Sequence, residues 1–205
     1  MLVDKDKDSQ WLKYYYPGTN VIFNNYGIKD YDMLKEVEAT NSFNRLMELQ
    51  DKPINMNFDK NHLNEINKYL FEDVYPFAGK YRDINMPEEY GGFLEIKDAQ
   101  DIGLYLDTLF EKTNKELMLV DDKKKFAELI STLYKELMKC HPFREGNGRT
   151  IREFVREFSI AKSKELGIGN LELDWSKIDK ENITDDNMIK MFEDALISSE
   201  DVKNK

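Results

Sequence analysis

The chain has 205 residues, 34% of them charged and 12% aromatic, with a formal net charge of −10. A chain of this length suits one domain, and its acidic balance argues against direct nucleic-acid binding, which needs clustered lysine and arginine. No apolar run approaches the roughly 20 residues of a membrane span, and the charged N-terminus lacks the apolar core of a signal peptide, so we expect a cytoplasmic protein with no membrane partner.

The ends of the chain set the expected limits of the domain. The PGTN sequence at residues 17–20 is typical of a turn. Residues 1–15 are therefore predicted to be an N-terminal arm, and residues 16–199 a single domain. The closing residues 200–205 are predicted to be a frayed tail.

The first half of the domain shows three helical patterns and one interruption. One pattern covers residues 31–49, another follows the plausible N-cap Asp59, and a third runs from Ala99 to Phe110. Between the last two, YRDINMPEEYGGFLEI at residues 81–96 is broken by a proline and two glycines. This break predicts a small β-hairpin.

The second half is more strongly helical. In KKFAELISTLYKELMKC, residues 124–140, apolar side chains recur at the i, i+3, i+4 and i+7 positions that form one stripe. A second stripe runs from Ile151 to Phe158 and ends near Gly167, and Thr184 can cap a further helix. We therefore predict an all-α fold, a helical bundle with one short β-hairpin.

The joint between the two strongest helices, HPFREGNGRT at residues 141–150, concentrates charged and flexible residues. Arg149 and Arg152 lie near the start of the second helix, where the helix dipole disfavours cations, so they indicate an anion. Gly146, Asn147 and Gly148 tolerate the backbone angles of an anion-binding nest. Together these residues predict a polyphosphate site.

Two further side chains at this joint fit that interpretation. Glu145 beside phosphates predicts a bridging Mg²⁺, which is usually held by one carboxylate, phosphate oxygens and water. His141 can accept a proton from a hydroxyl group. Phe143 most simply anchors the loop to the core.

Plainer interpretations remain open for each residue taken alone. A GxG sequence between helices is usually only a turn, His141 could be an ordinary helix-end histidine, and Glu145 with Arg149 could be a surface ion pair. Three other side chains are predicted to have structural roles: His62 on the surface, Arg156 on a solvated face, and the single cysteine, Cys140, as a buried filler that excludes an intrachain disulfide.

Residues 141–152 resemble, position for position, the HxFx(D/E)GNGRxxR motif of Fic (filamentation induced by cAMP) proteins. The resemblance extends back to YPGTN at Tyr16 and to LFEDVYPFAGKYRD at residues 70–83, and forward to about Leu173. It implies the Fic fold and an enzyme that transfers AMP from ATP to a serine, threonine or tyrosine hydroxyl of a target protein, releasing pyrophosphate.

The resemblance also implies roles for individual residues. His141 would deprotonate the target hydroxyl, and Glu145 would hold Mg²⁺ against the α- and β-phosphates. The remaining nucleotide-binding residues would be Phe143, Gly146, Asn147 near the α-phosphate, Gly148, Arg149 at the β-phosphate and Arg152 at the γ-phosphate. The hairpin flap, including Asn85, Gly92, Phe93 and Leu94, would position the target.

Several alternatives stay open within and outside this family. Doc relatives carry a lysine at the position of Gly148 and transfer phosphate, so Gly148 and Arg149 favour AMP transfer. Phosphocholine transfer and AMP removal are not excluded by the motif. From other classes, a non-catalytic nucleotide-binding regulatory module and a purely structural helical domain remain as rivals.

Regulation is the last expectation from the resemblance. Many Fic proteins carry an inhibitory helix with the pattern Ser/Thr-x-x-x-Glu-Gly/Asn, whose glutamate pairs with the second motif arginine. Only Thr132 and Glu136 approach this pattern, inside a predicted core helix. The chain therefore resembles the toxin branch, in which a small antitoxin supplies the helix and type II topoisomerase subunits are among the targets.

Overall fold

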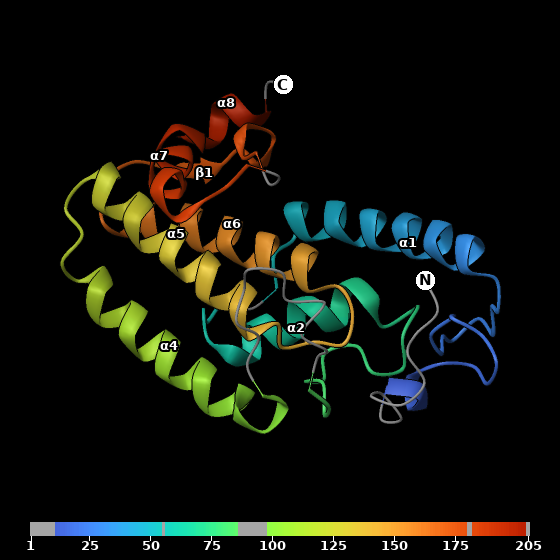
Figure 1. Ribbon diagram of the computed structural model, residues 1–205. Helices are drawn as coiled ribbons and strands as arrows, with labels where there is room; N and C mark the ends of the chain where they lie inside the picture. The colour runs from blue at the N-terminus through green and yellow to red at the C-terminus, as the bar shows by residue number, and fades with distance from the viewer. Residues whose placement is uncertain (1–10, 55, 86–97, 180–181, 204–205) are drawn as a thin grey trace.

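The computed structural model describes residues 11–54, 56–85, 98–179 and 182–203, and this part of the chain is mostly helical (Figure 1). Helices α5 and α6 run side by side through its middle, with α4, α2 and α1 around them and α7 at one end (Figure 1). The helices are α1 (Tyr31–Asp51), α2 (Lys60–Phe71), α4 (Ile102–Leu117), α5 (Lys123–Cys140), α6 (Asn147–Glu165), α7 (Asp185–Ala195) and α8 (Ser199–Lys203), with 3-10 turns η1 (Trp11–Tyr14), η2 (Ala99–Asp101) and η3 (Trp175–Lys177).

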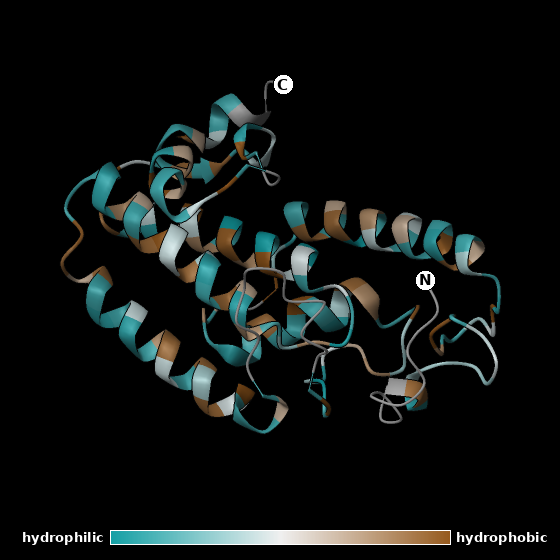
Figure 2. Ribbon diagram, in the orientation of Figure 1, coloured by the Kyte–Doolittle hydropathy of each residue, from teal (hydrophilic) through white to brown (hydrophobic). Residues whose placement is uncertain are grey.

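The core lies where the apolar stripes of α5 and α6 meet. Leu133 and Leu137 of α5, and Ile151 and Phe154 of α6, are almost completely buried. Figure 2 shows hydrophilic and hydrophobic residues interspersed along α4 and α5, as expected for helices with one buried face. No helix within the described ranges combines the length and the apolarity needed to cross a bilayer.

The expected helix starts are confirmed by their caps. The Asp59 side chain accepts from the backbone N–H groups of Asn61 and His62, each at 2.9 Å. At the start of α7, the backbone N–H of Thr184 donates to Oδ1 of Asn187 at 2.7 Å, which is half of a capping box. Side chains therefore satisfy donors that the helices leave unpaired.

Two polar residues expected on the surface are buried instead. His62 is 1% exposed, and its Nε2 lies 2.9 Å from Oε2 of Glu157 on α6. Arg156 is 9% exposed and pairs with Glu153 at 2.8 Å and with Glu172 of strand β1 (Leu171–Leu173) at 3.1 Å. Both predictions were wrong because Glu157 for His62, and Glu172 for Arg156, come from elements that only the tertiary fold brings together.

Both ends of the described chain contact other parts of the molecule. Within residues 11–15, Tyr14 donates to Asp83 and Tyr15 pairs with Ile22. Strand β1 (Leu171–Leu173) pairs antiparallel with β2 (Leu196–Ser198), and α8 occupies most of the expected tail. The expected hairpin lies outside the described residues, apart from Asn85 and the residues just before it.

A close approach between α2 and α6 fixes the turn before α6. Gly146 has a φ of +80°, and a Cβ added there would lie 2.1 Å from the ring of Phe71, the last residue of α2. Any side chain would therefore meet both backbone strain and a fixed aromatic ring. Only glycine satisfies both constraints.

We expect Gly146→Ala to lower the free energy of unfolding by about 3 kcal/mol, because a left-handed alanine costs about 1–2 kcal/mol and overpacking a further 1–3 kcal/mol or so. The matched control is Gly27→Ala, which has a φ of +69° but nothing within 4 Å of the added Cβ. Urea unfolding of both variants isolates the steric part. Equal losses in the two variants would show that Phe71 gives way freely.

Candidate functional site

The loop between α5 and α6 is held closed by its own asparagine. Asn147 is 4% exposed; its Oδ1 accepts from the backbone N–H of Phe143 at 2.9 Å, and its Nδ2 donates to the Phe143 carbonyl at 2.7 Å. Phe143 is buried and anchors the loop, as expected. The amide of Asn147, expected near a phosphate, is thus engaged in shaping the loop.

Helix α6 begins directly after this loop, and its N-terminus has no side-chain cap. Its N-cap is Gly146, which has no side chain to accept from the first backbone N–H groups of the helix. Unpaired N–H groups and the positive end of the helix dipole favour an anion here. Gly148 is the second residue of α6, and a Cβ added there would lie 3.1 Å from Nη1 of Arg152. The Arg152 side chain therefore lies close to the backbone at the start of α6.

His141 ends α5 in a left-handed conformation, with a φ of +44°. Burial lowers the pKa of its imidazole to about 4, and the nearby charges of Arg82 and Arg144 contribute to the shift, while a hydrogen bond to the backbone of Met138 opposes it. The ring is therefore neutral over the physiological pH range. A neutral imidazole can accept a proton.

Arg82 is a residue of this site that sequence reasoning missed. It is 1% exposed, and its guanidinium donates to the carbonyl oxygens of His141 at 2.8 Å, Ile84 at 2.8 Å and Cys140 at 3.3 Å. It therefore covers carbonyls at the C-terminal end of α5, where a cation is favoured. Arg82 lies inside the resemblance to Fic proteins at residues 70–83, but nothing in its spacing signalled this contact.

Glu145 is held by the arginine beside it. Nη1 of Arg144 lies 2.6 Å from Oε1 of Glu145, and its Nη2 donates to the hydroxyl of Tyr15 at 2.7 Å. The Glu145 side chain is 35% exposed. Burial raises the pKa of Glu145, which the charge of Arg144 opposes. Within the described part of the chain, no group of three or more His, Cys, Asp or Glu side chains forms a metal-binding cluster.

The two motif arginines have different surroundings. Arg149 pairs with Glu38 of α1, donates to Oγ of Ser42, and stacks on Phe71 with its Cζ 4.8 Å from the ring centroid. Arg152 lies within hydrogen-bonding reach of the Tyr134 hydroxyl, and burial lowers its pKa. The suggested Glu145–Arg149 surface pair does not occur, because each residue has another partner. Glu38 lies 111 residues before Arg149 in the sequence, so the spacing of the motif could not identify it.

Of the expected flap residues, only Asn85 is described; Gly92, Phe93 and Leu94 lie outside the described residues. The Asn85 side chain donates to Oδ1 of Asp98 at 2.7 Å and accepts from the backbone N–H of Ala99 at 2.8 Å. These contacts join residue 85 to the start of η2.

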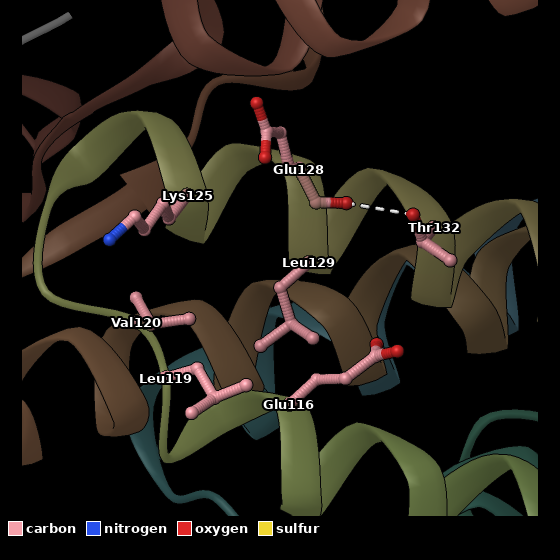
Figure 3. A pocket seen from close by; sticks show the side chains of 7 residues that line it. All are labelled: Glu116, Leu119, Val120, Lys125, Glu128, Leu129 and Thr132. Carbon is pink, nitrogen blue, oxygen red and sulfur yellow. Dashed lines mark hydrogen bonds between the residues drawn. The ribbon is translucent and has the colours of Figure 1, made fainter.

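A surface hollow of about 400 Å³ lies elsewhere, between the end of α4 and the first half of α5 (Figure 3). Leu119, Val120 and Leu129 form its apolar wall, with Glu116 and Glu128 nearby (Figure 3). Its last lining residue on α5 is Thr132, about 2.5 turns before His141. The hollow is therefore separate from the loop that gathers the candidate residues.

Comparison with known sequences identifies relatives of this chain. The protein adenylyltransferase VbhT of Bartonella schoenbuchensis is 33% identical over 169 residues, which cover 82% of this chain and 33% of VbhT. This chain thus spans about a third of the length of that relative. A probable protein adenylyltransferase of Sinorhizobium fredii is 30% identical over 187 residues, covering 90% of this chain and 85% of the relative.

Comparison with solved structures agrees with the sequence relatives. The BepC effector protein of Bartonella tribocorum, crystallised with bound AMPPNP, superposes with a TM-score of 0.74 at 26% identity, covering 92% of this chain and 98% of that one. The sequence model of the Fic/DOC family matches residues 57–159, half of the chain, and this stretch contains the loop described above. The chain therefore belongs to the Fic/DOC family.

Proposed function

We propose that this protein transfers AMP from ATP to a hydroxyl side chain of a target protein and releases pyrophosphate. The observation that carries the proposal is the loop between α5 and α6. It gathers a neutral, half-buried histidine, a carboxylate, two arginines and a helix N-terminus without a side-chain cap. The names of the VbhT and Sinorhizobium relatives, and the AMPPNP bound to BepC, support the same activity.

His141 would act as the general base in this reaction. As the target hydroxyl oxygen forms its bond to the α-phosphorus, its proton passes to the imidazole, and the bond between the α-phosphorus and the bridging oxygen breaks. Pyrophosphate leaves with that oxygen. The neutral state of His141 supports this role, because only the unprotonated ring can accept the proton.

The nucleotide phosphates would lie at the N-terminus of α6. Its backbone N–H groups at Gly146, Asn147 and Gly148 would contact phosphate oxygens, with Arg149 at the β-phosphate and Arg152 at the γ-phosphate. Phosphoryl-type transfer depends chiefly on positioning and charge stabilisation. This loop supplies both without a covalent step on the protein.

Glu145 would hold the Mg²⁺ ion of the nucleotide. Its carboxylate is partly exposed and stands without a cluster of further acidic ligands in the described part of the chain. That setting fits Mg²⁺, which usually takes one or two protein carboxylates and completes its shell with phosphate and water oxygens. Bound there, the ion would offset phosphate charge.

The target protein would be presented by the segment from Asn85 through Gly92, Phe93 and Leu94. Type II topoisomerase subunits are the first defined targets to test, because the toxin branch that this sequence resembles modifies them. We place this reaction in the cytoplasm, because the enzyme would need ATP as the donor of AMP.

We propose further that a small antitoxin restrains the enzyme in trans. Within the described residues no carboxylate pairs with Arg152, the arginine that the family's inhibitory glutamate contacts. Glu136, from the one near match to the inhibitory pattern, is occupied by Tyr105 and Lys139. The outer side of α1 exposes Met33, Phe43 and Met47, an apolar surface that a partner helix could cover.

The decisive test is label transfer from ATP with Mg²⁺, incubated with the protein and host-cell lysate or purified topoisomerase subunits. We expect protein-bound label from α-labelled ATP and none from γ-labelled ATP, because AMP carries only the α-phosphorus. His141→Ala should reduce the rate by about 10²–10⁴, the usual contribution of a general base. Circular dichroism confirms that the variant is folded.

Other outcomes of the same experiment separate the rival functions. Label from the γ-position alone would indicate phosphate transfer with the nucleotide reversed. ATP binding without transfer to any protein would favour a nucleotide-binding module. Label that persists undiminished in His141→Ala would remove His141 from the mechanism.

The pH dependence of kcat/KM should follow the lowered pKa of His141. A base with a pKa near 6.5 would be about 90% protonated at pH 5.5 and lose about tenfold in rate, whereas one with a pKa of about 4 stays neutral. We therefore expect kcat/KM to fall little between pH 7.5 and 5.5 on account of His141. ATP affinity and folding are measured at each pH, and an acid limb near 6.5 with both unchanged would contradict the assignment.

A further inference from the structure

A carboxylate from outside the motif reaches the phosphate end of the site. Glu38, in the second turn or so of α1, accepts from Nη2 of Arg149 through its Oε1, and Ser42, one turn later, accepts from Nη1 through its Oγ. Helix α1 therefore contacts both terminal nitrogens of the same guanidinium. The Glu38 side chain is only 15% exposed.

The Glu38 carboxylate is itself held in place by a second hydrogen bond, from Tyr75. Its second oxygen, Oε2, accepts from the hydroxyl of Tyr75, which is 4% exposed. The Tyr75 ring stacks on Phe77 with centroids 5.1 Å apart and on Phe71 with centroids 6.4 Å apart. Since both carboxylate oxygens have donors and the tyrosine is packed, Glu38 has little freedom to move.

Arg149 keeps donors for a ligand despite this contact. A guanidinium has five N–H groups, of which the contacts with Glu38 and Ser42 use two. The Phe71 ring supports one face of the guanidinium, and 32% of the side chain remains exposed. The remaining N–H groups are therefore free to serve a phosphate while α1 fixes the terminal edge.

Electrostatics gives a reason for such a contact. Arg149 is the third residue of α6, at the positive end of the helix dipole, and the charges of Arg149 and Arg152 repel each other. Without a phosphate, an isolated cation there would be displaced toward water. An ion pair with Glu38 holds it at the helix start before nucleotide binds, which reduces the ordering that binding requires.

We infer that Glu38 is a positioning residue for Arg149, holding its guanidinium so that the free N–H groups face the nucleotide phosphates. The inference rests on the proposed function of the loop. Glu38 does not contact the reacting atoms; it acts through Arg149. Tyr75 contributes by fixing Glu38.

The opposite role, a latch that withholds Arg149 from the phosphates, fits the contacts less well. A latch must release, but release would leave the mostly buried Glu38 carboxylate without its cation, an arrangement that is costly in a protein interior. The three N–H groups left on Arg149 also make release unnecessary. The two roles predict opposite effects of removing Glu38.

The test is ATP affinity, measured with Mg²⁺ by isothermal titration on the full chain, for Glu38→Ala, Glu38→Gln, Arg149→Ala and the double variant. We expect Glu38→Ala to weaken ATP binding by about tenfold, within the usual range for coupled neighbours, and Glu38→Gln by less, because an amide oxygen can still accept from Arg149. In the Arg149→Ala background, Glu38→Ala should cause no further loss beyond about twofold.

Two controls separate positioning from general damage. AMP, which lacks the β- and γ-phosphates, should bind equally to wild type and Glu38→Ala. Glu36→Ala, on the exposed side of α1, should leave ATP affinity unchanged. If Glu38→Ala folds poorly, Tyr75→Phe keeps the aromatic packing and removes one donor to Glu38, and it should weaken ATP binding to a smaller extent.

Three outcomes would overturn the inference. Tighter ATP binding by Glu38→Ala would make Glu38 a latch. An equal loss in the presence and absence of Arg149 would make its role structural. Unchanged ATP affinity in Arg149→Ala would remove both the inference and the assigned role of Arg149, while AMP transfer itself would still stand or fall on the label experiment with His141→Ala.

Discussion

The site depends on one constraint, the pair of hydrogen bonds between the Asn147 side chain and the backbone of Phe143. They close the connection between α5 and α6 so tightly that the C-terminal end of one helix lies beside the N-terminal end of the other. The two helix ends carry opposite partial charges, so the C-terminal end of α5 favours a cation and the N-terminal end of α6 favours an anion. The buried guanidinium of Arg82 covers carbonyls of the first, and the second is left open by the glycine N-cap at Gly146.

The same closure links the shape of the loop to the acidity of its histidine. Arg82 donates to the His141 carbonyl, so it fixes the backbone, and its charge, added to burial, lowers the pKa of the His141 ring. A neutral imidazole beside a cation is a poor partner for structural ion pairing and a suitable acceptor for a proton. One buried arginine thus caps α5 and adds to the effect of burial in lowering the pKa of His141.

Sequence reasoning succeeded where local rules decide the outcome and failed where distant elements meet. The spacing of apolar residues and the capping residues predicted the helices, including the starts at Asp59 and Thr184. Both signals depend only on residues that are neighbours in the sequence. The motif brought His141 and the arginines to one loop for the same reason. The partners of His62 and Arg149, and the Glu172 partner of Arg156, depend on how α1, α2, α6 and β1 pack, and the hydrophobic periodicity of the sequence does not contain that information.

The unequal treatment of the two motif arginines has a chemical consequence. Arg149 has a carboxylate from α1, whereas Arg152, within the described ranges, has the uncharged hydroxyl of Tyr134 and no carboxylate. Of the two motif arginines, Arg152 is therefore the one whose charge lacks a carboxylate partner among the described residues, and burial increases the cost of that arrangement. An anion that reaches Arg152 gains more than one that reaches Arg149. If Arg152 binds the terminal phosphate as proposed, a glutamate supplied by a partner would compete with that phosphate for the same cation.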